Sequence, residues 1–153
     1  MSAKITIEKQ ATALKTILDK HKTERVVVLG GTCVGKTTLL AHIPGAQDMD
    51  KLVFPLLTET ETKYVRQKPW TPEIGKTMTR LTKERVKIES GEPVFGTIVL
   101  DADHIICLKI SDELLRERTA LRGVSFDDAK NMQAQIDEQM AVSDLSVTEF
   151  NLG

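Results

Sequence analysis

The chain has 153 residues, 41% of them hydrophobic and 28% charged, and its formal net charge is −1. This length and composition are typical of one soluble domain with room for a real core. The balanced charge argues against binding to nucleic acid or to an anionic membrane, and neither a membrane span nor the apolar segment of a signal peptide occurs. Two cysteines do not make a disulfide framework, so we expect a reduced, cytoplasmic protein, either a monomer or a homodimer.

Residues 6–21 predict the first element, an amphipathic helix. Apolar side chains recur there at helical spacing between lysines and acids, namely Ile7, Ala11, Leu14, Ile17 and Leu18. We expect this helix to pack on a sheet; the alternative is a helix that binds a partner.

Residues 25–38, RVVVLGGTCVGKTT, predict a buried strand, a glycine-rich loop and the start of a helix. They contain G-x-x-x-x-G-K-[ST], the pattern of phosphate-binding P-loops. Glycines let backbone amides approach phosphate oxygens, the lysine supplies a mobile charge, and the threonine hydroxyl can ligate Mg²⁺. We expect the phosphates of a nucleotide to bind at Gly30, Gly31, Thr32, Cys33, Val34, Gly35, Lys36, Thr37 and Thr38. Cys33 either fills a variable loop position or is a redox-sensitive thiol.

Asp48 and Asp50 follow the next helix, which Pro44 and Gly45 stop early. They flank one residue at the end of a predicted strand, so their side chains would point to the same side of an extended backbone. Aimed at the loop, one carboxylate can hold a Mg²⁺-bound water and the other a substrate hydroxyl. The alternative is a solvated turn in which both acids serve turn formation.

We expect residues 54–90 to form a segment that covers a substrate. Its first part, 55–71, is irregular in pattern, and its aromatic side chains Tyr64 and Trp70 either stack on a flat ligand or brace the loop. A helix follows, capped by Thr71, and runs to Ser90 and Gly91. Arg85 lies on the apolar stripe of this helix, so it must extend to solvent, form an ion pair or contact a substrate anion.

Residues 97–110 predict two strands that Asp101 and Asp103 separate. Asp101 ends the first strand, where an acid can reach the magnesium shell, in competition with the Asp48/Asp50 pair. His104 begins the second strand, and we expect it to be structural because nothing supplies it with metal-ligand partners.

A helix over residues 112–121 then carries Arg116, Arg118 and Arg122. Arginines three or four residues apart share a helix face, so two of them can converge on one polyanion. The alternative is a solvated basic face at a helix C-terminus, where the dipole favours cations. A further helix runs from Ser125 to about Met140, and a short strand of alternating pattern closes the chain.

Taken together, these features resemble the P-loop small-molecule kinases, the group of nucleoside-monophosphate, shikimate and dephospho-coenzyme A kinases. Asp48-Met49-Asp50 is similar to the D-x-D of shikimate and dephospho-coenzyme A kinases, where the pair handles magnesium and the accepting hydroxyl. Residues 106–118 are similar to the strand-helix run of these kinases, in which Arg118 and Arg122 match arginines of a lid. Residues 122–139 resemble the stretch after the lid arginine in dephospho-coenzyme A kinase.

The resemblance covers roughly residues 25–150 and implies a single domain over residues 1–153. The implied fold is a three-layer α/β P-loop NTPase fold, with a five-stranded parallel sheet of order 2-3-1-4-5, helices on both faces and the ligand crevice at the strand C-termini. Residues 118–127 would form a short lid. Helix 6–21 is additional to the family pattern, and the final helix of these families is missing.

The function we expect is ATP-dependent, Mg²⁺-assisted phosphoryl transfer to a small acceptor, either a nucleotide or a hydroxylated metabolite. Lys36 would hold the phosphates, Thr37 with Asp48 or Asp101 the Mg²⁺, and Asp50 the acceptor hydroxyl; Arg118 and Arg122 would close over the transferring group, with Arg85 on the acceptor side. The alternatives are a regulatory ATP-binding or slow ATPase module, or a kinase-like protein without turnover. The GTPase signatures D-x-x-G and N-K-x-D do not occur.

Overall fold

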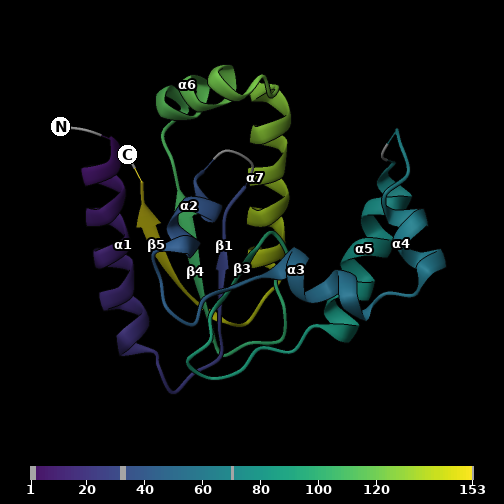
Figure 1. The fold of residues 1–153 in the computed structure, drawn as a ribbon, viewed down its shortest axis with the longest axis horizontal. Helices are drawn as coiled ribbons and strands as arrows, with labels where there is room; N and C mark the ends of the chain where they lie inside the picture. The colour runs from purple at the N-terminus through teal and green to yellow at the C-terminus, as the bar shows by residue number, and fades with distance from the viewer. Residues whose placement is uncertain (1–2, 32–33, 70, 153) are drawn as a thin grey trace.

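A parallel sheet forms the centre of the computed structural model, which describes residues 3–31, 34–69 and 71–152 (Figure 1). In chain order the elements are α1 (Ala3–Lys20), β1 (Val26–Leu29), α2 (Lys36–Ala41), β2 (Gln47–Asp48), α3 (Met49–Val53), the 3-10 helix η1 (Phe54–Leu56), α4 (Glu59–Val65), α5 (Pro72–Arg85), β3 (Val94–Gly96), β4 (His104–Lys109), α6 (Asp112–Arg122), α7 (Phe126–Ala141) and β5 (Ser146–Asn151).

The five strands lie in the order β2-β3-β1-β4-β5, and every neighbouring pair is parallel. The predicted α/β class, parallel sheet and strand order are therefore confirmed. β1 is the central strand and all four of its residues are buried. A strand covered on both faces reads as a continuous apolar run, which is why Val26 to Leu29 carry no polar residue.

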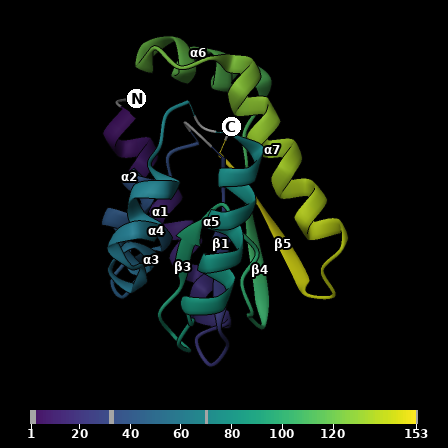
Figure 2. The same ribbon diagram turned by 90° about the vertical axis from the view of Figure 1, so that its right-hand side faces the viewer.

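The alternation of side chains along β1 divides the core between the two faces of the sheet. Val26 and Val28 pack with α1 and α2, through Leu14 and Leu39 among others. Val27 and Leu29 share a second cluster with side chains of α3 and α7. Figure 2 shows α7 running beside β4 and β5. The amphipathic helix predicted for residues 6–21 is thus observed as α1, and it packs on the sheet as expected.

Residues 54–85 form an arm of helices that stands beside the sheet (right-hand side of Figure 1). The arm has a small core of its own, in which Val65, Ile74 and Leu81 are buried. The expectation of an irregular segment over 55–71 is wrong, because α4 occupies Glu59–Val65. Thr58 and Glu61 form a reciprocal capping box at its start.

The helix expected over 71–90 begins as predicted, with the Thr71 side chain accepting the Ile74 N–H, but ends at Arg85. After it, buried Val86 and Ile88 alternate with exposed Lys87, a pattern of extended chain. Gly91 is therefore not a helix cap. It has φ 79 and lies in a turn where Glu89 and Glu92 form an isolated antiparallel bridge.

β3 lies three residues earlier than the strand expected from residue 97 onward. The segment after it is held by a side chain of α7: Gln139 accepts the Val99 N–H (2.9 Å) and donates to the Thr97 carbonyl (3.0 Å). This amide satisfies backbone groups that a strand would have paired with a neighbour.

Within the described ranges, no helix combines the length and the apolar character that crossing a membrane requires.

Candidate functional site

The glycine-rich loop, residues 30–35, joins the carboxyl end of β1 to α2; Thr32 and Cys33 lie outside the described residues. The Gly30 N–H donates to the carbonyl of Gly96 at the end of β3 (3.1 Å). A Cβ at Gly30 would lie 2.7 Å from Val34 Cγ2, so a side chain there would clash with the Val34 side chain. Gly35 enters α2 at φ 101, a conformation that glycine adopts without strain.

Lys36, the first residue of α2, folds back over this loop. Its Nζ donates to the carbonyls of Gly30 (2.6 Å) and Gly31 (3.2 Å). Thr37 and Thr38 follow in the first turn of the helix and are exposed. The lysine ammonium therefore lies over the strand end of the loop, bonded to its first two carbonyls.

Arg118 of α6 reaches the same loop from a part of the chain 84 residues away. Its Nη1 donates to the carbonyl of Val34 (2.6 Å), and a Cβ at Gly35 would lie 3.4 Å from that nitrogen. Arg116 turns elsewhere, with its guanidinium 4.6 Å from the centre of the Phe126 ring. Arg122 is exposed at the end of α6 and has no partner in the part of the chain that the structure describes. Among the described residues, Arg118 therefore contacts the loop and Arg122 does not.

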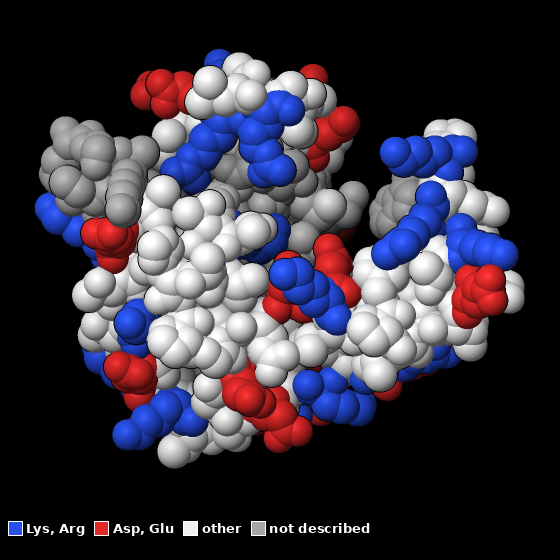
Figure 3. Space-filling view, in the orientation of Figure 1, with Lys and Arg blue, Asp and Glu red and all other residues white. Residues whose placement is uncertain are grey.

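Residues 118–127, expected to form a short lid, comprise the last turn of α6, Gly123 and the start of α7. Gly123 has φ 66 and ends α6, and the Ser125 hydroxyl caps α7 by accepting the Asp128 N–H. In Figure 1, α6 lies across the carboxyl edge of the sheet. Figure 3 shows Lys and Arg side chains below α6 on the body of the molecule, and farther to the right a gap between this body and the arm.

Asp48 and Asp50 form an acid turn rather than an extended pair. Asp48 ends β2 and caps α3, its Oδ1 accepting the Asp50 N–H (3.0 Å). The expectation that both carboxylates lie along a strand is wrong, because α3 begins at Met49. Asp50 is exposed as a residue, but the surrounding protein partly desolvates its carboxyl group and so raises its pKa; the Asp48 charge adds to this, whereas Lys36 opposes it. The charge of Lys36 at the loop thus acts on the Asp50 carboxyl group.

Asp101 does not lie near this site. It precedes β4 at the amino edge of the sheet, where its Oδ2 is 3.1 Å from Arg25 Nη1. Asp103 binds both the backbone N–H (2.8 Å) and the guanidinium of Arg25. Arg25 immediately precedes β1, whose four residues span roughly 13 Å before the loop begins. Asp101 as a magnesium residue is therefore a wrong prediction; Asp101 and Asp103 clamp the start of β1.

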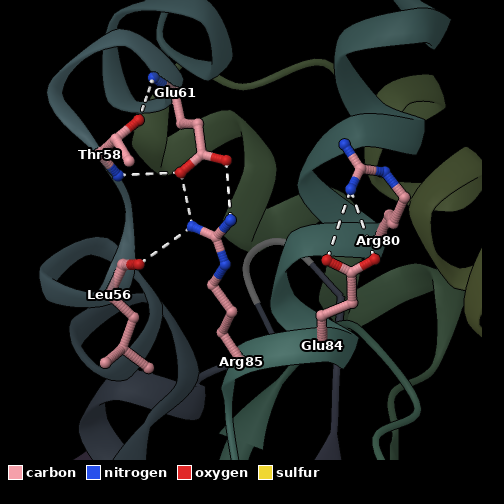
Figure 4. A network of polar contacts seen from close by, with 6 residues as sticks. All are labelled: Leu56, Thr58, Glu61, Arg80, Glu84 and Arg85. Atoms are coloured by element: carbon pink, nitrogen blue, oxygen red, sulfur yellow. Dashed lines mark hydrogen bonds and ion pairs between the residues drawn. The ribbon is translucent and has the colours of Figure 1, made fainter.

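Arg85 forms an ion pair, which was one of the three alternatives expected for it. Its Nη2 lies 2.9 Å from Glu61 Oε2, and its Nη1 donates to Glu61 Oε1 and to the Leu56 carbonyl (Figure 4). The guanidinium lowers the pKa of Glu61 to about 2, together with the Thr58 N–H. Because protein acceptors already take both terminal nitrogens, Arg85 holds the arm together, and the expected contact with a substrate anion is not supported.

The loop also packs against α7, a contact that the sequence pattern does not indicate. A Cβ at Gly31 would lie 3.4 Å from Met132 Cγ and 3.5 Å from Gln133 Cγ. A cavity of about 40 Å³ beside the loop is lined by Gln133 and by the ion pair of Lys109 and Asp137 (3.1 Å). The sequence could have indicated Lys109 as a residue near the loop, because it is the polar residue that ends an apolar strand.

Comparison with known proteins adds no relative: no protein-family model matches the chain, and a search of the curated proteins returns no match. The interpretation of the site rests on its own residues.

Proposed function

We propose that the chain binds the phosphates of ATP at the glycine-rich loop and transfers the terminal phosphoryl group to a small acceptor. The observation that carries the proposal is the meeting of two cations from separate elements, Lys36 of α2 and Arg118 of α6, at one loop between the central strand and a helix. The fold is compatible with a P-loop NTPase, since the loop lies at the carboxyl edge of a parallel sheet, where such folds bind ligands.

In this proposal the protein acts mainly by holding charge and geometry. Lys36 exchanges its loop carbonyls for phosphate oxygens, and Arg118 turns from the Val34 carbonyl toward the transferring group. Both cations are then next to the charge that develops during transfer, and α6 keeps bulk water from it. Arg122, one turn beyond Arg118, would join only if the end of α6 moves toward the loop.

The residues around the loop fit a magnesium ion that arrives with the nucleotide. Mg²⁺ prefers oxygen ligands and is commonly held by one or two carboxylates together with substrate phosphates. Thr37 and Asp48 offer a hydroxyl and a carboxylate of that kind. In the described residues, no group of three or more His, Cys, Asp and Glu could hold a metal by itself. The ion would neutralise phosphate charge, with Thr37 and Asp48 as its protein ligands.

Asp50 is suited to orient or deprotonate an acceptor hydroxyl. It is an exposed residue at the acid turn, and its raised pKa makes it a better base than an ordinary aspartate. If the acceptor is instead a phosphate, no base is needed, and Asp50 would only orient it.

The test is ADP release from Mg·ATP with a panel of nucleoside monophosphates, dephospho-coenzyme A and small hydroxy acids. We expect one acceptor class to raise the rate, Lys36→Ala to abolish the increase, and Lys87→Ala, an exposed lysine outside the site, to leave it unchanged. Slow ADP release that no acceptor stimulates would favour the regulatory module. Binding without turnover would favour the inactive kinase-like protein, and absence of binding would refute all three.

A further inference from the structure

Gly96 lies between the two halves of the site. It is the last residue of β3, the strand that separates β1 from β2. On one side it pairs with Leu29, and its carbonyl accepts the Gly30 N–H (3.1 Å) where the loop begins. On the other side, the preceding residue, Phe95, pairs with Asp48 of the acid turn. The end of β3 is therefore the direct mechanical link between the loop and the acid turn.

Met49, the residue between the two acids, packs against Gly96. It is 2% exposed, although it stands between Asp48 and the exposed Asp50. A Cβ at Gly96 would lie 2.6 Å from both Sδ and Cε of Met49 and 2.7 Å from its Cβ, closer than side-chain carbons approach one another. The thioether end could swing away, but the Cβ of Met49 is fixed to the backbone. A side chain at position 96 therefore requires the backbone of the acid turn or of the end of β3 to shift, and either shift changes their spacing.

We propose that Gly96 is a positioning residue: its bare backbone seats Met49, and this seat sets the spacing between the acid turn and the glycine-rich loop. The inference rests on the proposed function, because it gives that spacing a role in phosphoryl transfer. A purely structural glycine would affect folding alone, whereas a positioning residue separates transfer from nucleotide binding.

The decisive variant is Gly96→Ala. A displacement of about 1 Å at a reacting centre lowers turnover by about 10²-fold, so we expect acceptor-dependent kcat to fall by that order. The Kd for Mg·ATP should change far less, because the phosphates contact the loop and the Gly30 hydrogen bond to the Gly96 carbonyl is kept. Equal kcat in Gly96→Ala and wild type would overturn the inference.

Two control variants separate positioning from stability. Gly96→Ala/Met49→Gly removes the three atoms nearest to the added Cβ, and we expect it to recover part of the kcat lost in Gly96→Ala. Ala102→Val adds bulk in the core at the amino edge of the sheet, where Ala102 is 5% exposed, and should lower Tm without lowering kcat. A double variant no better than Gly96→Ala, or a kcat that simply follows Tm across the three variants, would leave Gly96 with a packing role only.

A readout independent of activity distinguishes failure of this inference from failure of the proposed function. In ¹H–¹⁵N spectra, Gly96→Ala should shift the Asp50 amide, which donates to Asp48, and the double variant should return it toward its wild-type position. An unmoved Asp50 amide refutes the positioning role, whether or not the protein transfers phosphate. If the amide behaves as expected but no acceptor supports transfer in the wild type, the proposed function fails and the seating of the acid turn stands.

Discussion

Replacing Arg118 by alanine should weaken nucleotide binding much more than it weakens the fold. In the free protein the guanidinium is half-buried and makes a charge-assisted hydrogen bond to the Val34 carbonyl, which water can partly replace. The loss should therefore be about 1 kcal/mol, which corresponds to a fall in Tm of about 2–4 °C. With a nucleotide bound, a unit charge about 5 Å from a phosphate at an effective dielectric constant of about 20 contributes roughly 3 kcal/mol. That is about a 10²-fold increase in Kd.

Arg116→Ala is the matched control, because it removes the same side chain from the same helix. Its guanidinium lies over the Phe126 ring rather than at the loop. A cation–π contact of about 0.5–1 kcal/mol predicts a similar fall in Tm but an unchanged Kd. Isothermal titration with Mg·ATP and thermal denaturation of both variants measure the two quantities. An unchanged Kd in Arg118→Ala, or an equal increase in both variants, would refute the placement of Arg118 at the phosphates.

Three further outcomes follow from the charges. The pKa of Glu61 in the folded protein is lowered from 4.5 to about 2, so ionised Glu61 stabilises the fold fully above pH 4.5 and this stabilisation is lost as the pH falls toward 2. The Tm of Glu61→Gln should therefore fall less across this pH range than the Tm of the wild type. Burial first, and then the charge of His21, lower the pKa of His104, so the stabilisation of the fold by neutral His104 is lost as the pH falls below 6.5. Because His21 stacks on His104, His21→Ala should raise the pKa of His104, which an NMR titration measures. Asp101→Asn should leave Mg²⁺-dependent turnover unchanged, whereas Asp48→Asn should lower it; the reverse order would contradict the site.

The sheet and the loop could be predicted because local signals and tertiary structure agree there. The valines of β1 read as a buried strand, and the motif after them fixes where the loop turns. The downstream strands carry enough apolar pattern for the order of the sheet to follow from the resemblance. α1 was predicted for the same reason, since its apolar stripe is regular from Ala11 to Leu18.

The rest depended on contacts that the sequence does not display. Val99 and Leu100 have the composition of a strand, but Gln139 takes the backbone groups of that segment, and Asp101 is carried to the far edge of the sheet. Arg85 was recognised as unusual on an apolar stripe, but its partner Glu61 belongs to a helix that was not expected. The capping box at Thr58 was a local signal of that helix and could have been used.

The most direct test of the account is a titration of the full chain with Mg·ATP, with Lys36→Ala and Lys87→Ala measured beside the wild type. Lys36 makes two hydrogen bonds to the loop, whereas Lys87 is exposed between two buried residues outside the site. We predict saturable one-to-one binding in the wild type and Lys87→Ala, and binding at least about tenfold weaker in Lys36→Ala. Equal affinity in all three proteins, or no binding in the wild type, would contradict the assignment of the glycine-rich loop as a phosphate site.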